Sequence, residues 1–145
     1  MSTDHPLQPL VGHWSSAGRT VARPGEPALE IAGTDVYRWL PGGHFLEHRV
    51  DVRVGGEQVD VLEVIGEPDP RTGGYLMRSF DHLGHAGTMV AAVDPDGVWT
   101  FAGTTSRARL VVAADGVSMT ARWERLPDGG DWEHWMDMTF SRDAP

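Results

Sequence analysis

Glycine and proline recur along the whole chain at intervals of about 8–14 residues, and this spacing constrains the fold most strongly. The 145 residues include 18 Gly and 10 Pro. Helices need runs of roughly 10–14 residues without such interruptions, so a helical bundle is excluded. The segments between the turn signals are rich in Val, Thr, Trp and Phe, which favour strands. The pattern therefore predicts an antiparallel meander.

We expect about ten strands in a single all-β domain that spans residues 1–145. They lie near residues 13–21, 29–40, 44–54, 57–66, 75–82, 85–93, 98–103, 106–114, 117–125 and 132–142. Successive hairpins in one small domain most simply close into an up-and-down barrel, because closure removes exposed strand edges. A two-sheet sandwich is the alternative, and a short helical turn is expected around residues 6–11.

Charge and missing residue types exclude several classes of function. The formal net charge is −9, and such an acidic surface disfavours nucleic acid and membrane partners. The chain contains no Cys and no Lys, which excludes disulfides, thiolate metal sites and Schiff-base chemistry. The first residues lack the pattern of a signal peptide, and no apolar run approaches 18 residues. We expect a cytoplasmic protein.

The turn at Pro41-Gly42 predicts which side chains face inward on the flanking strands. A two-residue turn there pairs Trp39 with His44 and Asp35 with His48. One face then carries Tyr37 and Trp39 with Leu, Ile and Val residues, whereas the other carries mostly charged residues. A slip by one residue would mix the two faces, so the inner face is well specified.

The next two turns extend this inner face. A turn at Gly55-Gly56 pairs His48 with Glu63, and pairing Glu67 with Gly74 places Arg78 opposite Glu63. Neighbouring strands lie about 5 Å apart. The expected result is a polar row across an apolar inner face, and it consists of Asp35, His48, Glu63 and Arg78.

The last strands complete the expected interior. Alternation places Trp123 on the inner face, together with His134 and Met136. Apolar walls with a few convergent polar groups are typical of a small-molecule site. The candidate ligand-binding residues are Tyr37, Trp39, His44, His48, Glu63, Arg78, Trp123, His134 and Met136.

The polar row allows three interpretations: a structural network, ligand recognition, or catalysis. In the catalytic interpretation His48, Asp35 or Glu63 is the general base and a neighbour orients it. Without a nucleophile beside it, isomerisation, cyclisation or hydration suits such a site best. We expect no metal site, because His44 and His48 lie about 13 Å apart along one strand, too far to share an ion.

Two stretches resemble known proteins. Leu10-Val11-Gly12-His13-Trp14 resembles the G-x-W opening of calycin barrels such as lipocalins, fatty-acid-binding proteins and nitrobindins. In those barrels the Trp packs against an Arg of the closing strand, and Arg142 has the corresponding position. The stretch 33–46, with 63–66 and 78–81, resembles a family of short bacterial proteins classed as a domain of unknown function. The resemblance implies a calycin-like, lipocalin-like barrel.

The sequence thus predicts a barrel that binds a small, largely hydrophobic molecule in its cavity without a cofactor. One alternative is a cofactor-free acid–base enzyme that uses the same cavity. The other comes from the resemblance to nitrobindins, which ligate haem through a His near the C-terminus: it makes haem the alternative cofactor and His134 its ligand. A small hydrophobic molecule is the expected partner, and a homodimer is compatible with this prediction.

Overall fold

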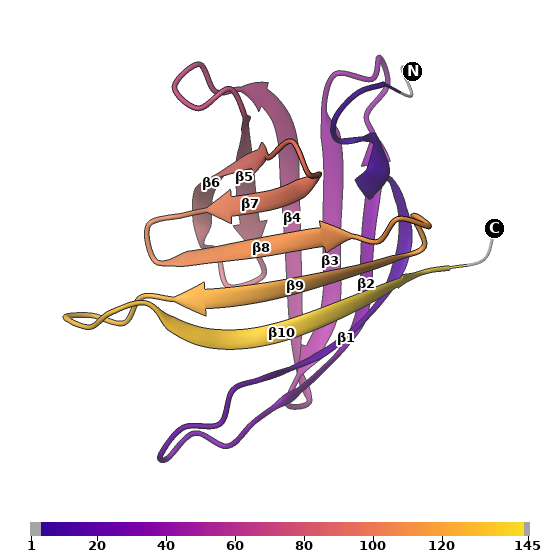
Figure 1. Ribbon diagram of the computed structural model, residues 1–145. Coiled ribbons are helices and arrows are strands. Elements are labelled where there is room, and N and C mark those ends of the chain that lie inside the picture. Colours follow the sequence, from indigo (N-terminus) through magenta and orange to yellow (C-terminus); the bar gives the residue numbers. More distant parts are fainter. Residues whose placement is uncertain (1–3, 144–145) are drawn as a thin grey trace.

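Ten antiparallel strands form the protein in the computed structural model, which describes residues 4–143 (Figure 1). The strands are β1 (Gly12–Thr20), β2 (Glu30–Trp39), β3 (Leu46–Val54), β4 (Glu57–Pro68), β5 (Tyr75–Asp81), β6 (Ala86–Val93), β7 (Val98–Ala102), β8 (Ser106–Val112), β9 (Ser118–Arg125) and β10 (Glu133–Arg142). Every bound lies within two residues of its expected position. The one helical element within residues 4–143 is the 3-10 turn η1 (Gln8–Leu10), where a helical turn was expected.

The strands close into one barrel with the order β1-β10-β9-β8-β7-β6-β5-β4-β3-β2. Each strand pairs with its neighbours in the sequence, and β1 also pairs with β10, so that Trp14 lies opposite Arg142. The closed barrel is the expected all-β architecture, and the sandwich alternative is wrong. Among the described residues, no helix is long and apolar enough to cross a membrane.

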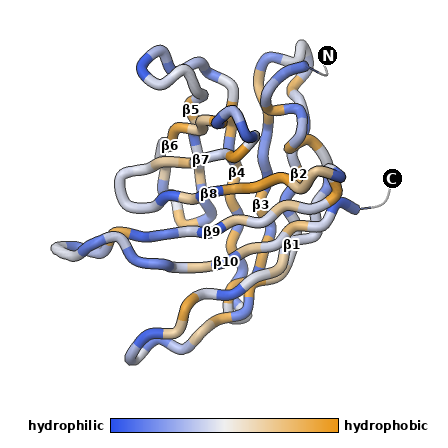
Figure 2. Tube along the Cα trace, in the orientation of Figure 1, coloured by the Kyte–Doolittle hydropathy of each residue, from blue (hydrophilic) through white to orange (hydrophobic). Residues whose placement is uncertain are grey.

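Side chains alternate between the interior and the outer surface along the strands. On β3, Leu46, His48 and Val52 are buried, whereas Arg49 and Arg53 are exposed. Figure 2 shows the corresponding alternation of hydrophobic and hydrophilic residues along the tube. This period of two is the property of a pleated strand with one buried face.

One end of the barrel, here called the base, is filled by side chains. Leu7 and Leu10 from the segment around η1 pack there with Trp14, and all three are fully buried. The indole Nε1 of Trp14 donates a hydrogen bond of 2.9 Å to the Leu10 carbonyl. The N-terminal segment therefore closes the base through apolar burial and a satisfied indole.

Arg142 fixes this closure from the last strand. Its guanidinium carbon lies 4.2 Å from the centroid of the Trp14 ring, which confirms the Trp–Arg contact expected from the G-x-W resemblance. The same guanidinium donates to three backbone carbonyls, those of Pro9 and Val11 in the N-terminal segment and that of Gly116. Arg142 thereby connects the N-terminal segment to the β8–β9 turn.

Candidate functional site

The opposite end of the barrel, here called the mouth, is hollow. It is framed by the hairpin tips 21–29, 55–56, 82–85, 103–105 and 126–132. Inside it lies a cavity of about 940 Å³. Its apolar walls include Ile31, Val52, Met77, Phe101, Leu110, Trp123, Met136, Met138 and Phe140. A cavity of this size and lining is within the usual range for small-molecule sites, roughly 300–1,000 Å³.

Three buried ionisable side chains meet at the inner end of this cavity. His48 of β3 lies between Asp35 of β2 and Glu63 of β4. Its Nε2 is 2.6 Å from Asp35 Oδ2, and its Nδ1 is 2.9 Å from Glu63 Oε1. Each of the three residues is less than a tenth exposed, at 6% for Asp35 and 8% for His48 and Glu63. We call Asp35, His48 and Glu63 the floor cluster.

The name reflects where the cluster lies. From His48 toward the mouth, the inward-facing residues Val50, Val52 and Val54 all line the cavity. On the other side of the cluster, Leu46 and Ile65 are fully buried and lie outside the cavity lining. On these strands the floor cluster therefore marks the boundary between the filled base and the hollow mouth.

The strand register explains how the cluster forms. His48 pairs with Glu63 as expected from the Gly55-Gly56 turn. The expected pairing of Asp35 with His48 is wrong by two residues, because Leu40 N–H donates to the Phe45 carbonyl and leaves four residues in the turn. A shift of two preserves the face, so Asp35 still reaches His48 diagonally.

The same shift places Tyr37 directly opposite His48. The two rings stack with centroids 3.8 Å apart and planes inclined by 9°. Tyr37 is 5% exposed and lines the cavity, as expected for an inward aromatic side chain. The stacked ring fixes the orientation of the imidazole between its two carboxylates.

The hydrogen bonds define the charge of the cluster. Both ring nitrogens of His48 face carboxylate oxygens, and an imidazole donates from both nitrogens only when it is protonated. Burial alone would lower the pKa of His48, but the hydrogen bonds and charges of Asp35 and Glu63 outweigh it and raise the pKa to about 9. The floor cluster thus contains two acidic side chains and one basic side chain, so that with His48 protonated its formal charge is −1.

Asp35 also accepts a hydrogen bond from Ser16, which was not among the predicted site residues. The Ser16 hydroxyl of β1 donates a 2.5 Å hydrogen bond to Asp35 Oδ1, and Ser16 is 4% exposed. Ser16 follows the inward-facing Trp14 by two positions on the same strand. Alternation along β1 could therefore have revealed it from the sequence.

Arg78 is not part of this cluster, contrary to the sequence prediction. Glu63 pairs with Ser79, and Arg78 lies on the outer surface, where it bonds Glu67 at 2.9 Å. Glu67 pairs with Leu76 and not with Gly74, an error of two residues that preserves the face, and a bulge at Gly66 then shifts the register by one residue and changes the face. A Cβ on Gly66 would lie 2.7 Å from the His44 carbonyl oxygen, so glycine permits this close approach.

His44 and Trp39 also lie outside the cavity lining. His44 is exposed in the turn between β2 and β3, because this turn is longer than expected. Trp39 points inward but packs at the base, where its Nε1 donates to Gln8 Oε1 at 2.8 Å and its ring contacts His5 edge to face. The prediction that both residues lie beside a ligand in the cavity is therefore wrong.

The three remaining predicted residues lie on β9 and β10, and not all of them face the cavity. Trp123 and Met136 line the cavity, as expected. His134 faces the outer surface instead, where its Nε2 lies 2.9 Å from Asp137 Oδ1. A bulge between His134 and Met136 reverses the alternation there and turns Trp135 into the cavity.

Other polar groups form no comparable site within residues 4–143. The hairpin tip from Asp81 to His85 is a turn in which Asp81 Oδ1 accepts two backbone N–H groups. No group of three or more His, Asp or Glu side chains in this part of the chain is arranged to hold a metal ion.

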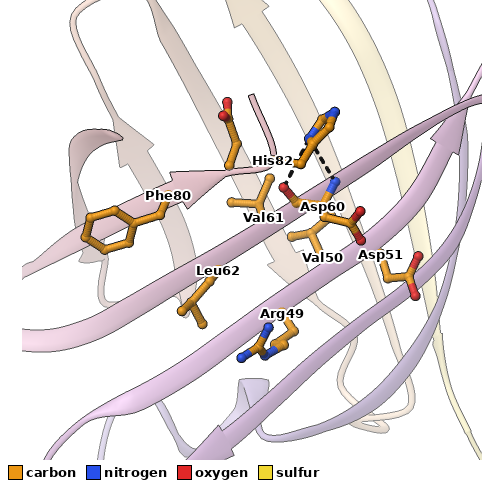
Figure 3. Close-up of a pocket in the computed structure, with 9 residues that line it drawn as sticks. Arg49, Val50, Asp51, Asp60, Val61, Leu62, Phe80 and His82 are labelled. Atoms are coloured by element: carbon orange, nitrogen blue, oxygen red, sulfur yellow. Dashed lines mark hydrogen bonds between the residues drawn. The ribbon is translucent and has the colours of Figure 1, made fainter. Parts of the chain in front are cut away.

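An outer pocket of about 330 Å³ lies between β3, β4 and β5 (Figure 3). None of its polar lining residues is buried, so it lacks a buried polar anchor; these residues are Arg49, Asp51, Asp60, Asp81 and His82.

Comparison with known proteins identifies a family. The chain belongs to the family described as "Protein of unknown function (DUF1579)", whose family model matches residues 2–122. No functionally curated protein matches the chain significantly.

Two solved structures share the fold over almost the whole chain. Rv2717c from M. tuberculosis is 15% identical, with a TM-score of 0.67 over 97% of this chain and 98% of that chain. The S-type phycobiliprotein lyase CPES from Guillardia theta is 11% identical, with a TM-score of 0.62 over 100% of this chain and 94% of that chain. At these identities the similarity concerns the fold.

Proposed function

We propose that this barrel binds a small, largely hydrophobic molecule in its interior cavity, with the floor cluster at the polar end of the ligand. The observation that carries this proposal is the contrast within one cavity of about 940 Å³: its walls are apolar, and one buried charged cluster lies at its floor. An apolar ligand gains free energy by leaving water for such walls. The floor cluster then orients it.

The same geometry weighs against His48 as a general base. Both of its ring nitrogens are engaged by carboxylates, and a pKa of about 9 keeps the imidazole protonated at neutral pH. A base must be unprotonated at the working pH to accept a proton. A catalytic role for the floor cluster would therefore have to rest on one of its carboxyl groups, with His48 as the residue that orients it.

Haem ligation through His134 also lacks support from the geometry. The His134 ring lies on the outer surface of β10, and its Nε2 is bonded to Asp137. A haem within the barrel would need an imidazole nitrogen that faces the cavity. The described cavity lining offers His48, whose nitrogens are both engaged, and His85 at the mouth.

A neutral fluorescent probe, Nile red, tests the proposed binding. We expect its fluorescence to rise and saturate on titration with the protein, because the apolar cavity excludes water from the dye. The variant Ala121→Phe fills the cavity, since Ala121 is 7% exposed and lines it, and should abolish the signal. The matched control Ala102→Phe adds the same ring on the exposed outer side of β7 and should bind Nile red like the wild type.

Two outcomes would contradict the proposal. The first is the absence of saturable Nile red binding to the folded wild-type protein. The second is equal binding by the Ala121→Phe and Ala102→Phe variants, because the dye would then occupy a surface site. Circular dichroism spectra of both variants show whether the barrel is retained.

A further inference from the structure

We infer that the ligand of this cavity carries a protonated amine, which the floor cluster receives, rather than a carboxylate. The inference rests on the proposed binding function and specifies the chemistry of the ligand. Three observations support it. The floor cluster has a negative formal charge, two oxygen atoms there have no hydrogen-bond partner, and the basic side chains that line the cavity are already paired with carboxylates.

The floor cluster has an uncompensated charge. Its two carboxylates share one imidazolium, so one negative charge remains within a buried site. A buried charge without a partner is costly, and an incoming cation lowers that cost. An incoming carboxylate would instead add a second uncompensated negative charge at the floor.

Two oxygen atoms at the floor are available to a ligand. Glu63 binds His48 through Oε1, and its Oε2 has no hydrogen-bond partner among residues 4–143. The Tyr37 hydroxyl likewise has no partner within the described chain, although Tyr37 is 95% buried and lines the cavity. Burial, with the charges of Asp35 and Glu63, raises the pKa of Tyr37, so its oxygen stays a neutral acceptor. An ammonium group, which donates up to three hydrogen bonds, matches these acceptors.

The remaining charged groups of the lining do not favour an anion. Arg125 is the lining guanidinium, and it is engaged by Glu26 at 3.0 Å and Glu133 at 2.8 Å. His85 is exposed at the mouth and lies 3.3 Å from Asp81. Further carboxylates line the cavity, those of Glu26, Glu57 and Asp81. Arg78, which the sequence placed beside Glu63, lies on the outer surface.

The position of the cluster also fixes the orientation of the ligand. The inner faces of β3 and β4 are lined by valines from the floor cluster to the mouth. The amine therefore binds deep in the cavity, and the apolar body extends toward the mouth.

Three probes with the same apolar body and different head groups test this inference: decylamine, decanol and decanoate. Each is titrated at pH 7.4 and below its micelle concentration against the wild-type protein loaded with Nile red. We expect decylamine to displace the dye with an affinity at least about tenfold higher than that of decanoate, and decanol to lie between them, since 1.4 kcal/mol corresponds to a factor of ten. Equal or tighter binding of decanoate would overturn the inference.

A pair of variants separates the floor from the general acidity of the protein. Glu63→Gln removes the uncompensated charge, and we expect decylamine affinity to fall about tenfold while decanol affinity changes less than about twofold. Asp51→Asn removes the same charge from the exposed outer side of β3 and should leave decylamine affinity within about twofold of wild type. An equal loss in both variants would mean that the amine responds to net charge, and the inference would be wrong.

Failure of this inference differs from failure of the proposed function. If Nile red binds and decylamine does not displace it, the amine inference is wrong and the binding function stands. If Nile red itself does not bind, both are wrong. The comparison of head groups on the wild-type protein remains decisive even where Glu63→Gln does not fold.

Discussion

Two tryptophans pack against arginine guanidinium groups at opposite ends of the barrel, in different surroundings. At the base, Trp14 is fully buried beneath Arg142, at 4.2 Å from ring centroid to guanidinium carbon. Beside the mouth, Trp132 is half-buried on the outer side, with Arg107 at 4.1 Å. Arg142 also binds backbone carbonyls, whereas Arg107 binds the side chain of Glu124 at 2.8 Å. The same contact thus belongs to a packed core at one end and to the surface at the other.

The ion pairs of the mouth extend this contrast. Arg125 connects the tips of two hairpins through Glu26 and Glu133, with side chains that are partly exposed to water. Exposed pairs of this kind stabilise a protein by at most about 1 kcal/mol. The comparison suggests a division of roles: the base provides stability, and the mouth adapts to a ligand. The following predictions test that division, from the largest expected effect to the smallest.

Removal of the buried indole is the strongest test. Trp14→Ala should lower the free energy of unfolding by about 3–5 kcal/mol, because it leaves a cavity in the packed base. Trp132→Ala, the matched change beside the mouth, should cost at most about half as much, because this half-buried ring loses less buried apolar surface. Urea unfolding followed by circular dichroism measures both values. Similar losses in the two variants would refute the contrast between the ends.

The floor cluster lies at the boundary and should show an intermediate effect. Asp35→Asn removes a charged hydrogen-bond partner of the His48 imidazolium, and we expect a loss of about 1.5–3 kcal/mol. Glu67→Gln makes the equivalent change in the exposed pair with Arg78 and should cost less than about 1 kcal/mol. Urea unfolding at pH 7 compares them. A loss for Asp35→Asn no larger than that for Glu67→Gln would show that the cluster contributes little to stability.

Stability should also depend on pH through His48. Its pKa is raised from 6.5 to about 9 on folding, so its contribution is fully present below pH 6.5 and is lost as the pH rises through 9. The difference in unfolding free energy between wild type and His48→Gln should therefore shrink from pH 6.5 to pH 9. The His48 ring resonance in an NMR titration provides an independent measurement. Titration of that resonance near pH 6.5 would contradict the assigned imidazolium.

The smallest effect is expected at the mouth. A double-mutant cycle of Arg125→Ala and Glu26→Gln should give a coupling energy below about 1 kcal/mol. Repeating the cycle in 1 M salt should reduce the coupling further, because salt screens exposed charges. A larger coupling that persists in salt would mean that the mouth is as firmly held as the base.

The sequence predicted the strands and most of one wall well, for a physical reason. Turn residues recur between every pair of strands, and the apolar and charged faces of β2 and β3 are so distinct that only an even shift is tolerated. The error of two residues at the Pro41 turn therefore left Asp35, His48 and Glu63 together. It also concealed the stacking of Tyr37 on His48.

The errors that changed a face occur where a strand gains an extra residue. Arg78 and His134 both lie beyond bulges, at Gly66 and between His134 and Met136. A bulge reverses the alternation without changing composition or turn spacing, so a count along the sequence does not detect it. Gly66 offered a signal, because a glycine within a strand often marks a bulge, whereas Trp135 offered none.

The seam between β1 and β10 has a consequence for the order of folding. All other strand pairs join consecutive strands, which need only short loops to meet, whereas Arg142 reaches the Val11 carbonyl across 131 residues of sequence. Closing so long a loop costs more entropy than any hairpin, so we expect this seam to form last. Until it closes, β1 and β10 present unpaired edges to other chains. We therefore expect closure of this seam, where Arg142 contacts Trp14, to remove the last unpaired strand edges.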